Sequence, residues 1–494
     1  MVSRRFAQRG HASLTTDLLR PGPDNVQRVT PRHRTFVVAT ALAVAALLAV
    51  SLHKRSADGE GGTVTEPVTT SPASSLIDSA LSRVQDVVQG AASTPASGLT
   101  PVPLTDEHLQ HVKPLMGQAE ARLIEIYRLI GNAQHRDALK QAESLVRDHP
   151  NFQLAHLVHG DLLSQQTRPV RRLGDVPDTQ ALAASEQLTA LREESRRRLL
   201  ALTERPPEGS VPTQFLTLSP QSRHAIAVDA SRSRLYLFEN LNPARGGGEA
   251  ERAPRLKLLG DFYISVGLSG IEKTLEGDKR TPLGVYYITS SLNPADLPDL
   301  YGVGALPINY PNALDLQRGK TGSGIWLHGT PSEQFVRAPQ ASDGCVVLSN
   351  PDLQRLLGTV QIRTTPVVIA PSLQWVQPEA LANDRTEFEA VLDAWRQTRS
   401  AGHLAELKTF YSSRFMNQGR DLAQWWPRVE SELRANGSRE LQMKDLSVLH
   451  WRDKDDTMVV TFGEVAAGQS RGVTKRQYWV REQDRWTIFF EGTI

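Results

Sequence analysis

The only cysteine of the sequence, Cys345, stands 17 residues after His328, a histidine that ends an apolar run. A thiolate is a strong nucleophile, but an ordinary cysteine ionises only near a pH of about 8.5, so a nucleophilic cysteine needs help from its surroundings. A histidine gives that help when a carbonyl or carboxylate fixes its tautomer. Glycine beside the cysteine lets backbone N–H groups approach a developing oxyanion. If the strands that carry the two residues are paired, the pattern predicts nucleophilic chemistry at Cys345.

A structural interpretation of the same residues stands beside this one. A cysteine flanked by valines is commonly a small buried hydrophobe, and a histidine after "IWL" is commonly a core residue. One cysteine excludes an intramolecular disulfide and a cysteine-rich zinc site. No His, Asp and Glu cluster has metal-ligand spacing, and no glycine-rich phosphate loop precedes a helix. The sequence therefore predicts no metal and no cofactor.

Three segments resemble the L,D-transpeptidase (YkuD-type) family. "HGTPSEQFVRAPQASDGCVVL" is similar to the family signature, in which His-Gly is followed after a gap by Ser/Thr-His-Gly-Cys and a hydrophobic residue. "VDASRSRLYLFE" resembles the opening hairpin of the family, and "EGDKRTPLGVYYI" resembles its Thr-Pro-x-Gly-x-Tyr/Phe strand. The resemblance covers about residues 220–371, with the segments in the order of the family, and implies its all-β fold.

The resemblance also implies a role for each matching residue. Cys345 is the expected nucleophile, His328 is the base, and the carbonyl of Gly329 orients the imidazole. The backbone N–H groups of Gly344 and Cys345 are the expected oxyanion donors. Members of the family act on peptidoglycan stem peptides: the cysteine attacks an L,D-peptide bond next to meso-diaminopimelate and a D-amino acid leaves. An amine or water then takes the acyl group.

Two positions depart from the family pattern. Asp343 stands where the family has a second histidine, and Val347 stands where it often has Arg or Asn. A carboxylate close to Cys345 disfavours the thiolate, and the loss of Arg or Asn removes a polar group from the pocket. The expected substrate-binding residues are Ser342, Asp343 and Thr330. The departures leave the acyl acceptor open.

An uncharged run, "TFVVATALAVAALLAVSL", occupies residues 35–52. As a helix it is about 27 Å long, which is enough to cross most of a hydrocarbon core of about 30 Å. Seven arginines and only two aspartates precede it, so the positive-inside rule keeps the N-terminus in the cytoplasm. We expect a single-pass anchor in the inner membrane with the catalytic part in the periplasm. A cleaved signal peptide and a buried core helix are the alternatives.

Shifts in composition divide the chain into six segments and predict a multidomain protein. The expected segments are a basic cytoplasmic tail at 1–34, the transmembrane helix at 35–52, a flexible linker at 53–104, an α-helical segment at 105–205, the all-β catalytic sandwich at 210–372, and an α+β domain at 380–494. In the catalytic segment, "NPDLQRLLGTV" is expected to form a helix with Asn350 as its N-cap and Pro351 as its first residue.

The helical segment has a clear apolar face. Helical spacing places five residues on it: Ala138, Leu139, Ala142, Leu145 and Val146. Pro150 is expected to end this helix before the next one begins. The arrangement resembles a tetratricopeptide-type hairpin, although only one or two copies are visible. We expect it either to dock envelope proteins or to support the next domain.

The C-terminal segment holds six of the eight tryptophans, which predicts an aromatic core of its own. "AWRQTRSAGHLAELKTFYSSRF" and "KRQYWVREQDRWTIFFEG" resemble NTF2-like domains, which are cones of helices and antiparallel strands around a pocket. Such a pocket is a candidate site for a peptide or glycan fragment, or for an envelope protein partner.

The primary interpretation is an enzyme that forms a Cys345 thioester with a peptidoglycan stem peptide. A hydrolase of the same family, cutting peptidoglycan or protein–peptidoglycan links, is the first alternative. A non-catalytic envelope scaffold that binds peptidoglycan is the second. A formal net charge of +2 gives no reason to expect a nucleic-acid partner.

Overall fold

The structure, a computed structural model, describes residues 98–102, 105–242, 253–437, 439–469 and 471–494. The expected basic tail, the expected transmembrane helix and most of the expected linker lie outside these residues. Within them, no helix combines the length and the apolar character needed to cross a membrane.

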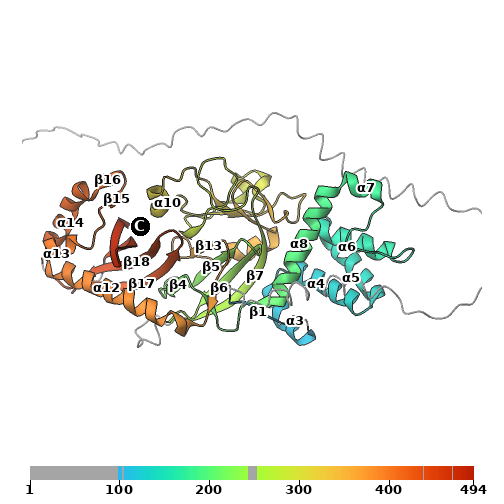
Figure 1. The fold of residues 1–494 in the computed structure, drawn as a ribbon, viewed down its shortest axis with the longest axis horizontal. Coiled ribbons are helices and arrows are strands. Elements are labelled where there is room, and N and C mark those ends of the chain that lie inside the picture. Colours follow the sequence, from blue (N-terminus) through green and yellow to red (C-terminus); the bar gives the residue numbers. More distant parts are fainter. Residues whose placement is uncertain (1–97, 103–104, 243–252, 438, 470) are drawn as a thin grey trace, which may run out of the picture. The chain divides into compact units, whose positions relative to one another are not determined.

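The helical segment packs around an apolar core (Figure 1). Its helices are α3 (Asp106–Val112), η3 (Lys113–Leu115), α4 (Gln118–Gly131), α5 (His135–Asp148), α6 (Gln153–Ser164), α7 (Asp178–Ala183) and α8 (Ser185–Thr203). The predicted face of α5 is confirmed: Ala138, Ala142 and Leu145 are fully buried, and the other two residues pack against the same core. Helix α5 ends just before Pro150, as predicted.

The catalytic segment forms one curled sheet, which has nine strands in the described residues. These are β5 (His224–Asp229), β6 (Arg234–Asn240), β7 (Leu256–Gly267), β8 (Gly284–Tyr287), β9 (Ala305–Pro307), β10 (Trp326–His328), β11 (Gln340–Ser342), β12 (Val346–Leu348) and β13 (Pro366–Ala370). Their order is β8-β13-β5-β6-β7-β12-β10-β9, and β11 pairs with β7. Val367 of β13 and Leu327 of β10 share one core although their strands lie far apart in the sheet, so the β-rich part of the prediction is confirmed.

Helices and short turns complete this domain. They are η4 (Pro294–Asp296), η5 (Asp299–Tyr301), α10 (Ala313–Gln317) and α11 (Asn350–Leu357). The predicted cap of α11 is wrong by one residue. Ser349 is the N-cap, and its hydroxyl accepts the backbone N–H of Asp352. The shorter serine side chain reaches this N–H, which frees Asn350 for other contacts.

The C-terminal segment packs helices on a second sheet (Figure 1). Its elements are η6 (Pro378–Leu381), α12 (Ala382–Ala401), α13 (Leu404–Lys408), β15 (Met416–Asn417), β16 (Arg420–Asp421), α14 (Leu422–Asn436), β17 (Leu441–Arg452), β18 (Asp456–Ala466), β19 (Val473–Glu482) and β20 (Arg485–Thr493). Trp395, Trp425 and Trp479 share its core, which confirms the predicted aromatic interior.

Two predicted boundaries are corrected. Strand β4 (Phe215–Thr217) pairs with β17, so it belongs to the C-terminal sheet although it precedes the catalytic domain in the chain. Strand β1 (Thr100–Pro101) pairs with β2 (Glu204–Arg205), within the segment expected to be a linker. Leu99 beside β1 is buried in an apolar core together with Phe215 and Trp375. Strands β3 (Val211–Pro212) and β14 (Trp375–Val376) form a further pair.

A buried ion network joins the helical segment to the catalytic sheet. Glu120 of α4 contacts Arg198 of α8 and Arg234 of β6, each at 2.8 Å. Arg234 also contacts Asp261 of β7 at 2.6 Å, and Asp261 pairs in turn with Arg205. These five side chains are all buried. A buried charge is tolerated only when it is paired. The helical segment therefore supplies the carboxylate that pairs with Arg234 of the sheet, and the two parts stabilise each other.

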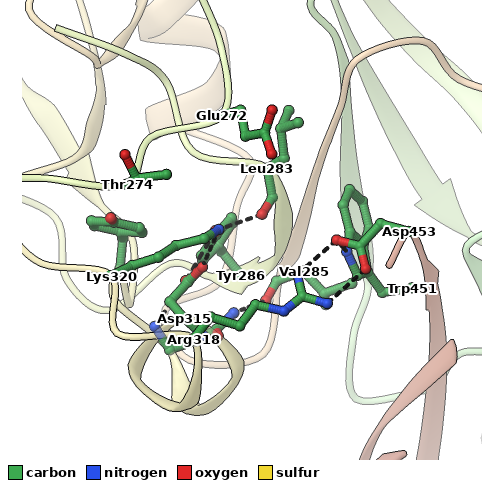
Figure 2. Close-up of polar contacts among 12 residues, drawn as sticks. Glu272, Thr274, Leu283, Val285, Tyr286, Asp315, Arg318, Lys320, Trp451 and Asp453 are labelled. Atoms are coloured by element: carbon green, nitrogen blue, oxygen red, sulfur yellow. Dashed lines mark hydrogen bonds and ion pairs between the residues drawn. The ribbon is translucent and has the colours of Figure 1, made fainter. Parts of the chain in front are cut away.

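Ion pairs also connect α10 to the C-terminal sheet. Arg318, directly after α10, contacts both oxygens of Asp453 at 2.7 Å, and Asp453 accepts the indole N–H of Trp451 (Figure 2). Within the catalytic domain, Asp315 accepts the Tyr286 hydroxyl at 3.1 Å and pairs with Lys320 at 2.8 Å (Figure 2). These contacts hold α10 against both domains.

Candidate active site

Two neighbouring parallel strands carry the predicted nucleophile and base. His328 is the last residue of β10, and Cys345 directly precedes β12. The strands pair with Leu327 opposite Val346 and His328 opposite Val347. Because alternate residues of a strand point to the same face of a sheet, extending the alternation of β12 back by one residue places Cys345 on the face that carries Val347 and His328. The predicted pairing of these strands is confirmed.

His328 is held as a neutral base. Its side chain is 3% exposed, and Nδ1 lies 2.7 Å from the carbonyl oxygen of Gly329. A carbonyl only accepts, so Nδ1 carries the proton and Nε2 keeps a free lone pair. Burial lowers the pKa of His328 to about 4, with the Gly329 carbonyl acting in the opposite direction. The imidazole is therefore neutral at pH 7 and able to accept a proton at Nε2.

Aromatic and amide contacts fix the turn after β10. The Tyr301 ring meets the His328 ring edge-on, with centroids 5.0 Å apart, and the Gly329 N–H donates to the Tyr301 carbonyl at 3.0 Å. Asn350 accepts the Thr330 N–H at 3.1 Å and donates to the Thr330 carbonyl at 2.9 Å. Asn350, missed as a site residue by sequence reasoning, therefore positions the turn that orients His328.

Cys345 carries a neutral thiol in the free protein. It is half-buried, and Sγ donates to the carbonyl of Gly324 at 3.5 Å. Burial raises the pKa of Cys345 to about 11, and Asp343 acts in the same direction. A backbone hydrogen bond from Trp326 and the charge of Arg337 act against this rise in pKa. The thiol proton must leave Gly324 for a base before Sγ can attack a carbonyl.

The predicted substrate-binding residues have different surroundings. Thr330 is fully buried and its hydroxyl donates to the Phe335 carbonyl, so it supports the turn and does not face a ligand. Ser342 is 2% exposed, and its hydroxyl donates to the Cys345 carbonyl at 2.6 Å. Asp343 is open to solvent, with a side chain 84% exposed and 3.7 Å from Lys279 Nζ. Of the three, only Asp343 is accessible to a substrate.

The two predicted oxyanion donors, the N–H groups of Gly344 and Cys345, differ in whether they already have a hydrogen-bond acceptor. The Gly344 N–H donates to the Ser342 hydroxyl at 3.1 Å, so it is already used, contrary to the prediction. The Cys345 N–H has no acceptor among the described residues. Ser342 therefore shapes the tight turn before β12 and leaves the Cys345 N–H as the donor for a developing oxyanion.

Arg337 is a further residue near the site that sequence reasoning missed. It is half-buried, and its charge acts on both Cys345 and His328. One signal was present: Arg337 is the only Lys or Arg between His328 and Cys345. The described residues contain no group of three or more His, Cys, Asp or Glu side chains that could hold a metal ion.

The raised pKa of the thiol predicts how its reactivity depends on pH. Because Cys345 has a pKa of about 11 in the free protein, its alkylation by iodoacetamide is expected to rise about tenfold per pH unit between about pH 7 and pH 9. Intact-protein mass spectrometry measures this rate. A rate that levels off by about pH 9, as for a thiol with the ordinary pKa of about 8.5, would contradict the expectation, and a plateau already near pH 7 would show a preformed thiolate.

Gly344 has a backbone that other residues adopt only with strain. Its φ is +120°, and a Cβ built there would lie 2.7 Å from the Arg280 carbonyl oxygen. We expect Gly344→Ala to cost about 1–3 kcal/mol of stability and to displace Cys345, which lowers turnover. Urea unfolding and turnover assays measure the two effects.

Gly319 offers a matched control for Gly344. Its φ is +69°, but a Cβ there would meet no heavy atom within 4 Å. Gly319→Ala therefore tests conformational strain alone and is expected to leave turnover intact. Unchanged turnover and stability in Gly344→Ala would show that the turn tolerates a side chain.

Two parts of the chain match family models, and these matches agree with the fold described above. Residues 223–369 match the L,D-transpeptidase catalytic domain (YkuD), and residues 387–492 match the Cds6 C-terminal NTF2-like domain. The chain thus carries an L,D-transpeptidase catalytic domain followed by an NTF2-like domain.

Solved structures similar to the chain come from several bacteria. Bd1075 from Bdellovibrio bacteriovorus is 23% identical over 57% of this chain and 98% of its own, with a TM-score of 0.47. The helical cell shape determining protein Pgp2 from Campylobacter jejuni is 20% identical over 57% and 95%, with a TM-score of 0.44. An L,D-transpeptidase from Mycobacterium smegmatis is 13% identical over 30% and 58%, with a TM-score of 0.19. No curated protein matches the chain.

Proposed function

We propose that this protein is a cysteine-dependent acyltransferase that acts on peptidoglycan stem peptides. The observation that carries the proposal is that adjacent strands of an L,D-transpeptidase catalytic domain place a buried, neutral His328 at the end of β10 and Cys345 directly before β12. The Gly329 carbonyl holds the Nδ1 proton of His328, so Nε2 is the atom that takes the thiol proton.

The proposed reaction has two halves. In the first, Cys345 loses its proton to His328 Nε2, Sγ attacks the carbonyl carbon of an L,D-peptide bond, and the Cys345 N–H binds the oxyanion. The C–N bond then breaks, and the leaving D-amino acid takes the proton from His328. In the second half, an amine attacks the thioester and restores the thiol, which completes transpeptidation. Attack by water would make the same site a hydrolase.

We also propose that this reaction takes place outside the cytoplasm, with the chain anchored in the inner membrane by residues 35–52. Support comes from the length of this uncharged run and from the arginines that precede it. Protease added to intact spheroplasts should then degrade the catalytic domain and spare the N-terminal tail. Full protection of the catalytic domain would contradict this location.

Product analysis tests the function. The full-length chain is incubated with muropeptides that carry tetrapeptide stems, and the products are identified by mass, beside a Cys345→Ala control. New cross-links or exchanged D-amino acids support transpeptidation, whereas shortened stems without transfer support hydrolysis. Identical products from the two proteins would overturn the enzymatic proposal and favour a scaffold.

A further inference from the structure

Arg337 lies in the connection between the base and the nucleophile, and the described residues provide no carboxylate partner for it. Its guanidinium makes one long contact, from Nη1 to the Ala341 carbonyl at 3.4 Å. No described Asp or Glu oxygen lies within ion-pair distance of it. Burial lowers the pKa of Arg337, while Cys345 and Asp343 act in the opposite direction. The charge is therefore partly desolvated, and its guanidinium lies against the Ala341 carbonyl, four residues before Cys345, without an ion-pair partner among the described residues.

The backbone that carries Arg337 is held from two sides. The Tyr263 hydroxyl, from β7, donates to the Arg337 carbonyl at 3.1 Å. Two residues earlier, the Phe335 ring stacks on Phe152 of the helical segment, with centroids 4.4 Å apart. The Phe335 N–H donates to the Asn151 carbonyl at 3.1 Å. The helical segment thus fixes the connection that places Arg337 beside Ala341, on the chain segment that leads to Cys345.

Arg197, a second arginine near this connection, differs from Arg337 because it has a carboxylate partner. A groove of about 440 Å³ lies between α8 and residues 338–340, directly after Arg337. Its cation, Arg197, already pairs with Glu193 at 2.8 Å. Arg337, by contrast, has no carboxylate partner among the described residues and is available to an incoming anion. A guanidinium presents a planar fork of donors that matches a carboxylate.

We propose that Arg337 binds a free carboxylate of the acyl donor, and that the helical segment holds Arg337 in place through the contact between Phe152 and Phe335. The identity of the donor as a stem peptide rests on the proposed function. The recognition of a carboxylate near Cys345 rests on the unpaired guanidinium of Arg337 and on its contact with Ala341, four residues before Cys345. Phe152 and Phe335 are positioning residues, since neither needs to touch the substrate.

Two small alkylating agents test the carboxylate site without peptide turnover. Iodoacetate and iodoacetamide react alike, with Sγ displacing iodide and forming one S–C bond, but only iodoacetate carries a carboxylate. The ratio of their rates at Cys345 therefore cancels the thiolate fraction. In Arg337→Gln the iodoacetate-to-iodoacetamide ratio is expected to fall about three- to tenfold, because one close cation is lost. Arg337→Lys keeps the charge and should retain most of the ratio. An unchanged ratio in Arg337→Gln overturns the proposal.

A separate pair of variants tests the positioning role of Phe152 and Phe335. Phe152→Ala is expected to lower the same ratio, whereas Leu129→Ala, a truncation in the same core on α4, should not. Equal ratios in these two variants would overturn the positioning role.

Stem peptides whose terminal carboxylate is amidated should show a raised KM with the wild type and no such difference with Arg337→Gln. A shifted alkylation ratio in a protein without peptide turnover would refute the proposed function and leave the carboxylate site standing.

Discussion

Replacing Cys345 by alanine is expected to lower stem-peptide turnover by about 10⁴-fold or more, because the substitution removes the nucleophile of a covalent mechanism. His328 and the Cys345 N–H remain, but neither forms a thioester. Release of the D-amino acid, followed by mass spectrometry, measures the rate. The fold should persist, since Cys345 is only half-buried and its Sγ makes only weak polar contacts, with the Gly324 carbonyl at 3.5 Å and with the Trp326 backbone N–H.

Cys345→Ser is the matched control for this variant. It keeps a hydroxyl of similar shape, but a hydroxyl is a much weaker nucleophile than a thiol activated by the same base. We expect turnover close to that of Cys345→Ala, with an unfolding midpoint close to that of the wild type. Wild-type turnover in Cys345→Ala would place the reaction at another residue.

Replacing Glu120 by alanine is expected to cause a large loss of stability, greater than the loss in Gly344→Ala. Glu120 is the carboxylate that Arg198 and Arg234 share, and both arginines are buried. Removing one partner from a buried ion network costs about 3–5 kcal/mol, and here it takes the shared counter-charge from two buried arginines, which leaves Arg198 with Glu194 and Arg234 with Asp261. Urea-induced unfolding measures the change in unfolding free energy.

A surface pair supplies the control for Glu120. Glu239 and Lys257 lie 3.9 Å apart and are well exposed to solvent. Glu239→Ala is therefore expected to change stability by only about 0–1 kcal/mol. Equal losses in Glu120→Ala and Glu239→Ala would show that the buried network does not join the two domains energetically.

Local patterns in the sequence predict much of this fold. The apolar spacing in α5 identifies its buried face because residues three or four positions apart lie on the same side of a helix. This pattern can be read from the local sequence without knowing which distant residues pack against it. The pairing of β10 with β12 could also be expected, since both runs are apolar and are bounded by glycine-containing turns. The roles of Cys345 and His328 can be predicted because a nucleophilic cysteine needs a base and because both residues match the family signature.

Other features depend on contacts that no local pattern encodes. Strand β4 joins the C-terminal sheet across more than two hundred residues of chain, and its short apolar run fits either domain. Asn350 resembles a helix cap, but Ser349 takes that role and Asn350 binds the turn at Thr330. The hydroxyl of Ser342 is used inside its own turn. Each depends on three-dimensional packing that the spacing of residues does not show.

The thioester at Cys345 is the central claim, and intact-protein mass spectrometry tests it most directly. The full-length chain is mixed with a tetrapeptide stem, quenched in acid within the first turnover, and weighed beside Cys345→Ala. We predict an added mass equal to the acyl tripeptide on the wild type, located at Cys345 by fragmentation and absent from the alanine variant. Turnover of the peptide without any adduct on the wild type, or the same adduct on Cys345→Ala, would contradict the account.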